Sequence, residues 1–148
     1  MKLQSNAFNN VGRIPSRFTC DGAGVSPGLA WQEAPPHTQS FAIICRDPDA
    51  PSGTWYHWAV FDIPKTCSAL AEGQTPAATR QGTNDFGKQG YGGPCPPRGH
   101  GIHHYQFVIY ALDVDHLEVT PRSGCRDIEK AAKAHAIATA QLVGTYER

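Results

Sequence analysis

Ten residues, His103-His-Tyr-Gln-Phe-Val-Ile-Tyr-Ala-Leu112, have the pattern of a β-strand. Successive side chains of a strand point to opposite faces, so every second residue from His103 to Ala111 shares one face. That face begins with His103 and Tyr105 and then becomes apolar, and the opposite face is also largely apolar. A strand with two apolar faces belongs in the middle of a sheet that is covered on both sides. The segment therefore predicts a central strand that carries polar groups at one end of a hydrophobic core.

Two more stretches have strand patterns. Phe41-Ala-Ile-Ile-Cys45 is a continuous apolar run, which is typical of a buried strand, and it stops at a turn. The stretch Trp55–Phe61 alternates. It predicts two faces, Trp55-His57-Ala59-Phe61 and Tyr56-Trp58-Val60. Weaker strand patterns occupy residues 17–20 and 29–31, and little regular pattern is found between residues 66 and 93.

One segment has a helical period. In residues 127–143 apolar or small side chains recur at steps of three and four, and several alanines add helix propensity. Gly144 suits the position after the last turn, while Ser123 and Asp127 are alternative N-terminal caps. His135 lies on the apolar stripe, so we expect it to pack in the core. The class is therefore mainly β with a C-terminal α-helix.

Length and charge restrict the function. The chain has 148 residues and no linker, which predicts a single domain over residues 1–148. Thirteen Lys and Arg balance thirteen Asp and Glu, so neither nucleic-acid binding nor electrostatic attraction to an anionic membrane is expected. No apolar run reaches the ~18–20 residues of a membrane span, and the first residues lack the apolar region of a signal peptide. We expect a cytoplasmic protein without integral membrane association.

The five cysteines have no C-x-x-C spacing and are odd in number; they are Cys20, Cys45, Cys67, Cys95 and Cys125. This pattern argues against zinc-ribbon and thioredoxin-like sites. We expect free, semi-buried thiols in a reducing compartment. A reactive Cys95 is the alternative, although the sequence places no obvious activating group beside it.

Glycine and proline are concentrated in one loop. The chain has 15 Gly and 12 Pro, and eight of these lie in residues 90–101. Gly92 and Gly93 allow backbone amides to approach a ligand closely, and such amides together with two imidazoles would form a cradle for an anion. The run Gly82-Thr-Asn-Asp-Phe-Gly87 is expected to close one side of this cradle.

Three places put ionisable groups at the ends of predicted strands. The first is the stiff turn Asp47-Pro-Asp-Ala-Pro51, in which Pro51 is a candidate for a cis peptide bond. The second is His57, and the third is His103 followed by Tyr105. Each has a simpler interpretation. The turn can be a solvated turn, and each histidine can be a core residue whose hydrogen bonds are made within the protein. Their combination favours a pocket.

Two histidines and a carboxylate also match a 2-His-1-carboxylate metal site, with His100 and His104 as spare imidazoles. Against a metal, His103 and His104 point to opposite faces of a strand, and no set of supporting carboxylates is evident. Hydrolysis by a Ser-His-Asp triad is disfavoured because no Gly-x-Ser-x-Gly motif exists and Ser52 fits a turn. We therefore expect no metal, no other cofactor and no catalytic residue.

Together these motifs resemble the phosphatidylethanolamine-binding protein family, most closely its bacterial Raf-kinase-inhibitor-like branch. The resemblance rests on Asp47-Pro-Asp-Ala-Pro51, Trp55-x-His57-Trp58, Tyr91-Gly-Gly-Pro-Cys-Pro-Pro97 and His103-x-Tyr105, and further matches extend it over nearly the whole chain. It implies an antiparallel β-sandwich with a small pocket for phosphate-like anions.

The resemblance also implies which residues form that pocket. They are Asp47, Pro51, Trp55, His57, Gly93, Pro96, His103 and Tyr105, with Gly92 at the rim and Asp49 in a supporting position. Many members have arginine where His104 stands, so positive charge at that lip is weaker here. The C-terminal extension of animal members is absent, so their kinase-regulating contacts are not expected.

The residues and the resemblance converge on non-catalytic binding of a small anion with a phosphate or carboxylate group, such as a phosphoethanolamine-type head group. His57 and His103 as cations, loop amides and the Tyr105 hydroxyl would donate to the anion, and Asp47 would orient a histidine. The alternatives are a regulatory inhibitor that docks a protease or kinase, and a hydrolytic or metal-dependent enzyme. A homodimer is expected only because two-fold dimers are the commonest assembly; the sequence identifies no protein partner.

Overall fold

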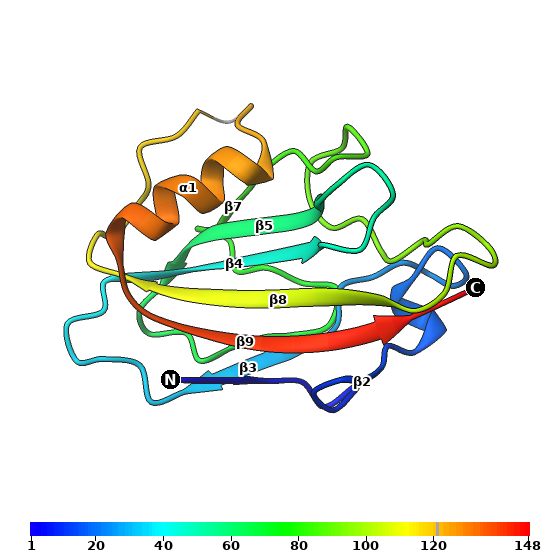
Figure 1. Cartoon of the computed structure of the whole chain (residues 1–148). Coiled ribbons are helices and arrows are strands. Elements are labelled where there is room, and N and C mark those ends of the chain that lie inside the picture. Colours follow the sequence, from blue (N-terminus) through cyan, green and yellow to red (C-terminus); the bar gives the residue numbers. More distant parts are fainter. Residues whose placement is uncertain (121) are drawn as a thin grey trace.

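The computed structural model describes residues 1–120 and 122–148, which form two β-sheets and one α-helix (Figure 1). The larger sheet has the strand order β2-β9-β8-β4-β5-β7, and the smaller has the order β1-β3-β6. The strands are β1 Lys2–Gln4, β2 Gly12–Arg13, β3 Leu29–Gln32, β4 Ser40–Asp47, β5 Trp55–Pro64, β6 Ala69–Leu70, β7 Arg80–Gln81, β8 His103–Leu112 and β9 Ala136–Tyr146, and helix α1 is Cys125–His135. Neighbouring strands are antiparallel, except that β2 runs parallel to β9.

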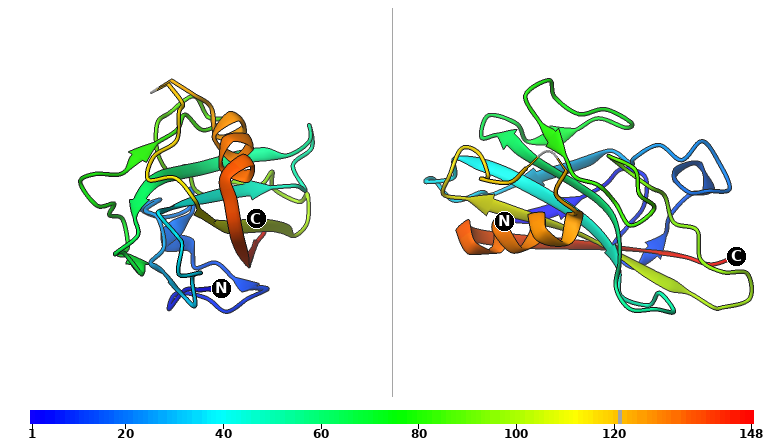
Figure 2. Two further views of the ribbon diagram at one scale, coloured as in Figure 1. Left: turned by 90° about the vertical axis from the view of Figure 1, so that its left-hand side faces the viewer. Right: turned by 90° about the horizontal axis from the view of Figure 1, so that it is seen from above.

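The larger sheet is covered on both faces (Figure 2). One face packs against the smaller sheet around a core that includes Trp31, Phe41 and Phe107. The other face packs under α1 around a core that includes Ile44 and Ile128. Strands β4 and β8 are therefore apolar on both faces, as their sequences predict. The mainly β sandwich with a C-terminal helix is confirmed.

Strand β5 contains a β-bulge that changes its predicted faces. In the register with β4, Tyr56 and Trp58 lie opposite consecutive residues, so His57 between them is the extra residue. Tyr56 consequently packs under the helix together with Ala59, whereas Trp58 packs on the other face. The predicted grouping of His57 with Ala59, and of Tyr56 with Trp58, is wrong because an inserted residue reverses the alternation.

The prediction of a helix over residues 127–143 is wrong for the second half of that stretch. Helix α1 ends at His135, and the chain continues as β9, which pairs along its length with β8. Helix propensity is a weak preference. It is outweighed here by the hydrogen bonds to β8 and by the burial of Leu142 in the core.

Two residues near this junction have roles other than those expected. Gly144 lies within β9, where a Cβ atom would come within 2.4 Å of the Ile14 side chain, so glycine permits close packing rather than ending a helix. His135 was expected in the core but is exposed, because α1 ends there. Its Nδ1 atom lies 3.1 Å from Oδ1 of Asp113.

Short elements account for the other differences. Residues 17–20, a weak strand candidate, instead overlap a 3-10 turn at Ser16–Phe18. The short strands β6 and β7 lie within residues 66–93, where the pattern shows little. Two residues are too few to display an alternation that a sequence can reveal.

The start of α1 is capped by backbone alone. Gly124 is the N-cap residue and makes no side-chain capping hydrogen bond, so neither Ser123 nor Asp127 has the predicted capping role. In the described part of the chain, no helix is both long enough and apolar enough to cross a membrane.

Candidate ligand-binding site

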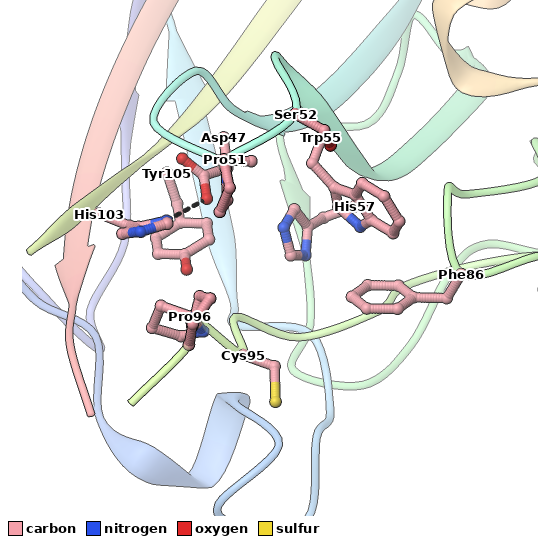
Figure 3. A pocket seen from close by; sticks show the side chains of 12 residues that line it. Asp47, Pro51, Ser52, Trp55, His57, Phe86, Cys95, Pro96, His103 and Tyr105 are labelled. Atoms are coloured by element: carbon pink, nitrogen blue, oxygen red, sulfur yellow. Dashed lines mark hydrogen bonds and ion pairs between the residues drawn. The ribbon is translucent and has the colours of Figure 1, made fainter. Parts of the chain in front are cut away.

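Three neighbouring strand ends of the larger sheet surround a cavity of about 260 Å³ (Figure 3). Strand β4 is antiparallel to both β5 and β8, so its last residue lies at the same edge as the first residues of its neighbours. Loops before β5 and before β8 complete the wall. The cavity is lined by Asp47, Ala50, Pro51, Ser52, Trp55, His57, Phe86, Cys95, Pro96, Pro97, His103 and Tyr105.

Most of the residues predicted to bind a ligand lie in this wall. They are Asp47, Pro51, Trp55, His57, Pro96, His103 and Tyr105. Gly92 and Gly93 do not line it and instead border a neighbouring pocket. The wall also contains five residues outside the predicted set, namely Ala50, Ser52, Phe86, Cys95 and Pro97. Four of them lie in or next to the stiff turn 47–51 and the loop 90–101, and Phe86 lies in the run 82–87, so loop position is the signal that points to them.

Asp47 and His103 form a buried pair in the cavity wall. Oδ2 of Asp47 lies 2.6 Å from Nδ1 of His103, and the two side chains are only 4% and 2% exposed. The second carboxylate oxygen of Asp47 accepts the backbone N–H of Asp49 at 2.8 Å. The histidine that Asp47 orients is therefore His103.

The other ring nitrogen of His103 is also occupied. Its Nε2 atom lies 2.7 Å from Nδ1 of His100, an exposed residue in the loop before β8. In this arrangement neither nitrogen of His103 is free to donate directly to a ligand, as the sequence interpretation assumed. His100 was noted only as a spare imidazole, because its three-residue separation from His103 does not reveal how the loop folds back.

Asp49 holds the turn between β4 and β5 against β8. Its Oδ2 atom accepts the backbone N–H of His104 at 2.8 Å and lies 2.7 Å from the Nδ1 atom of that residue. Burial acts to raise the pKa of Asp49, but the hydrogen bonds from His104 outweigh it and the pKa is lowered. The peptide bond before Pro51 in the same turn is not cis.

His57 is buried in its neutral form at the bulge of β5. Its Nδ1 atom lies 2.7 Å from the carbonyl oxygen of Gly92, which can only accept, so the proton is on Nδ1. Burial lowers the pKa of His57, and the hydrogen bond to Gly92 and the charge of Asp47 oppose this only in part. The burial therefore argues against the cationic His57 expected from the sequence.

The two glycines of the loop do not form the expected anion cradle. The amide of Gly92 donates to the backbone carbonyl of His57 at 2.8 Å and is not free for a ligand. At Gly93 a Cβ atom would lie 2.6 Å from the carbonyl oxygen of Phe18 and 2.9 Å from the Cα atom of Thr19. Glycine is needed at this position because the loop packs against the N-terminal segment.

A disulfide bond between Cys20 and Cys95 links that segment to the cavity wall. The expectation of five free thiols, and of a reactive Cys95, is wrong; Cys45, Cys67 and Cys125 are free. The two paired residues are 75 positions apart, so only the fold brings them together. Disulfides persist mainly in oxidising compartments. The cysteines therefore no longer favour a cytoplasmic location, which stays a prediction.

Aromatic side chains close the side of the cavity opposite the acid–histidine pair. Phe86 packs edge-on against Trp55 and His57, with ring centroids 5.4 and 5.3 Å apart. It comes from the run 82–87, which is expected to close one side of the site. The indole N–H of Trp55 is buried and has no partner among the described residues. Trp55 and Phe86 therefore give this side of the cavity an aromatic wall.

Tyr105 contributes a phenol from β8. Its ring is stacked 6.4 Å from that of His103 and lies edge-on to His57 (Figure 3). Burial, with a smaller contribution from the charge of Asp47, raises the pKa of Tyr105 far above its usual range. The phenol therefore keeps its proton at neutral pH and can act as a donor.

Within residues 1–120 and 122–148, no group of three or more His, Cys, Asp or Glu side chains is placed to hold a metal ion. Asp47 and His103 are instead hydrogen-bonded to each other, and His57 is bonded to the Gly92 carbonyl. Without a metal, this arrangement presents a buried, hydrogen-bonded Asp47–His103 pair and a phenol donor to a small ligand.

Comparison with known proteins identifies the family. Residues 4–147 match the family model described as phosphatidylethanolamine-binding protein. The chain is 46% identical over 153 residues to a UPF0098 protein of Methanothermobacter thermautotrophicus, covering 100% of this chain and 99% of that protein. It also resembles the crystal structure of Escherichia coli YbcL, described as a new member of the mammalian PEBP family, with a TM-score of 0.95, 35% identity and coverage of 99% and 98% of the two chains. The PEBP homologue CT736 of Chlamydia trachomatis superposes with a TM-score of 0.90 at 39% identity, covering 99% and 97%.

The match to the family model spans nearly all of the chain, and the relatives are similar to it over their whole length. The chain belongs to the phosphatidylethanolamine-binding protein family.

Proposed function

We propose that the chain binds a small molecule with a phosphate or carboxylate group, such as a phosphoethanolamine-type head group, in this cavity and does not transform it. Membership of the family supports a role in binding a ligand or a protein. The observation that supports an anionic ligand is the buried pair of Asp47 and His103 in the wall of an otherwise largely apolar cavity. A small apolar pocket with a few converging polar groups is the usual form of a ligand site.

The charge balance of the cavity suits one anion. A carboxylate in the wall would repel an anion, but a protonated His103 neutralises Asp47 and leaves the positive ring beside the cavity. The phenol of Tyr105 adds a neutral donor. Because His57 is neutral, the positive charge that would attract an anion comes from His103.

The size of the cavity favours a head group over a larger molecule. Its volume of about 260 Å³ lies just below the roughly 300–1,000 Å³ of sites that enclose drug-sized ligands. Prolines and a disulfide-linked residue form much of the wall, so the cavity is held with little freedom to widen.

Calorimetric titration with phosphoethanolamine, and separately with acetate, tests the proposal. Wild-type protein should bind, and His103→Ala should lose binding while keeping its circular dichroism spectrum and cooperative unfolding. His37→Ala, which changes an exposed histidine that does not line the cavity, is the matched control and should bind like wild type. Absence of binding by folded wild-type protein to either anion at millimolar concentration would overturn the proposal.

A second candidate is a regulatory inhibitor that docks a protease or kinase through the pocket region. The observation in its favour is the apolar ring of Phe86, which lines the cavity and is 45% exposed. A purified protease or kinase that binds wild-type protein but not Phe86→Asp, and that is displaced by phosphoethanolamine, would support this role. Binding unaffected by both changes would place any docking surface elsewhere.

A further inference from the structure

His100 joins the solvent to the buried acid of the cavity through His103. Nδ1 of His100 lies 2.7 Å from Nε2 of His103, and Nδ1 of His103 lies 2.6 Å from Oδ2 of Asp47. His100 is exposed, whereas the other two side chains are buried. His100 does not line the cavity itself. An effect of this residue on a ligand would therefore act through His103.

With Asp47 ionised, two proton arrangements satisfy both hydrogen bonds of His103. If His103 is neutral, its Nδ1–H donates to Asp47 and its Nε2 accepts from His100. If His103 is an imidazolium, it donates both to Asp47 and to a neutral His100. Hydrogen bonds accepted from the charged form favour that form, and a buried carboxylate without a cation is costly. The short contact to the buried carboxylate therefore favours the second arrangement.

We propose that His100 is a positioning residue of the anion site, which accepts a hydrogen bond from His103 and holds it doubly protonated beside the cavity. This inference rests on the proposed function in one respect, namely that the charge so held serves an anionic ligand. With both N–H groups engaged, His103 acts on the anion through its charge and its fixed ring, and direct donation falls to the other groups of the wall.

Most of the other charged groups near the Asp47–His103–His100 contacts form hydrogen bonds with residues other than His103. From the C-terminal end, Arg148 donates to the carbonyl of Pro96 and lies 3.2 Å from Asp21, which also accepts from Tyr146. Arg98 of the same loop acts on Asp21 as well. On the opposite face of β8, His104 is paired with Asp49. On the same face as His103, the uncharged ring of Tyr105 is stacked on it. In the described residues, Asp47 and His100 are the hydrogen-bond partners of the His103 ring.

Two substitutions separate the roles of His100. His100→Ala removes the acceptor, whereas His100→Asn places an amide oxygen near the former Nδ1 position and can accept but not titrate. His37→Asn is the matched control, since it changes an exposed histidine outside the chain of contacts. Because His100 is exposed, all three variants are expected to fold.

The first measurement needs no ligand. Nitrogen-15 NMR of histidine-labelled protein from pH 5 to 9 reports how many ring nitrogens of His103 carry a proton. Wild-type His103 should keep both protons to a higher pH than in His100→Ala, by about 0.5 pH unit or more, because a hydrogen bond from a charged donor stabilises the charged form. His100→Asn should restore the wild-type behaviour. If His100 acted only through its own titration or only by filling space, asparagine would not restore it.

The second measurement uses inorganic phosphate as the probe. Its affinity at pH 7.5 should fall about threefold or more in His100→Ala and recover in His100→Asn. A singly protonated His103 in wild type at pH 7, or identical NMR profiles for wild type and His100→Ala, would overturn the inference. The expected NMR profiles without any phosphate binding would support the role of His100 and overturn the proposed function, so the two failures are distinguishable.

Discussion

Arg46 of β4 donates to the carboxylate of Glu129 on α1, across the helix-covered face of the larger sheet. The same buried carboxylate accepts the hydroxyl groups of Tyr56 at 2.6 Å and Tyr110 at 2.7 Å. Burial, followed by the hydrogen bond to Glu129, raises the pKa of Tyr56 to about 12. The helix is thus attached to the sheet by one carboxylate with three donors, on the face away from the cavity wall residues Asp47 and His103.

Glu129→Gln should destabilise the fold by about 3 kcal/mol, because it leaves the half-buried Arg46 without its counter-charge and weakens the hydrogen bonds from two buried tyrosines. Urea unfolding followed by tryptophan fluorescence measures the loss. Glu118→Gln, at a carboxylate whose side chain is 92% exposed, is the control and should change little. Equal unfolding midpoints for the two variants would contradict the importance of this network.

Removal of the disulfide in the double variant Cys20→Ser, Cys95→Ser should lower the free energy of unfolding by about 4 kcal/mol. The cross-link closes a segment of 75 residues, which restricts the unfolded chain. Cys67→Ser, at a half-buried free cysteine, is the matched control. Alkylation of the denatured, unreduced protein should modify three cysteines; modification of all five would show that the bond is absent.

Gly93→Ala should destabilise the fold by about 2 kcal/mol and weaken phosphoethanolamine binding. The added Cβ atom would meet backbone atoms of Phe18 and Thr19 that cannot move aside as a flexible side chain can, so the loop carrying Pro96 must shift. Gly28→Ala provides the comparison, since its nearest atoms would lie 3.5 Å or more away. Similar effects of the two substitutions, in thermal unfolding and in titration calorimetry, would be evidence against tight packing at Gly93.

Stability should decrease as the pH falls below about 6.5, in part because of His57. The pKa of His57 is lowered in the folded state from the ordinary value of 6.5. As the pH falls, the unfolded chain therefore binds this proton first, which stabilises the unfolded state relative to the folded state. His57→Asn, whose amide can still donate to Gly92, should flatten the decrease between pH 6.5 and 5. The variant His37→Asn controls for the loss of an exposed histidine. An unchanged slope in His57→Asn would mean that His57 takes up its proton without cost in the fold.

Local pattern was sufficient wherever a segment interacts mainly through its own regular faces. Strand β8 has the bounds predicted for it, and β4 contains the predicted run, because alternation and apolar content report burial on each side of a sheet. The stiff turn at 47–51 and the loop at 90–101 were recognisable for a similar reason, since proline and glycine restrict or free the backbone locally. The ends of these segments already indicated a site that contains Asp47, His57 and His103.

Pattern failed where distant segments decide the outcome. The alanine-rich stretch after His135 has helical periodicity, but pairing with β8 makes it a strand. The bulge at His57 depends on the register with β4, and the bond between Cys20 and Cys95 depends on two loops meeting. Propensity within a segment is smaller than the free energy of pairing and burial between segments.

The sequence by itself therefore determined the class of fold, the central strands and the place of Asp47, His57, His103 and Tyr105 at strand ends, because these follow from periodicity and from residue type. The resemblance to the family supplied the remaining predicted residues of the cavity. Only the tertiary structure decided which histidine pairs with Asp47, that the pKa of His57 is lowered, that the Gly92 amide is not free, and that His100 completes the chain of contacts. Hydrogen-bond partners and burial arise between residues far apart in the sequence. The protonation of each group in the cavity is set by those neighbours, which no local pattern contains.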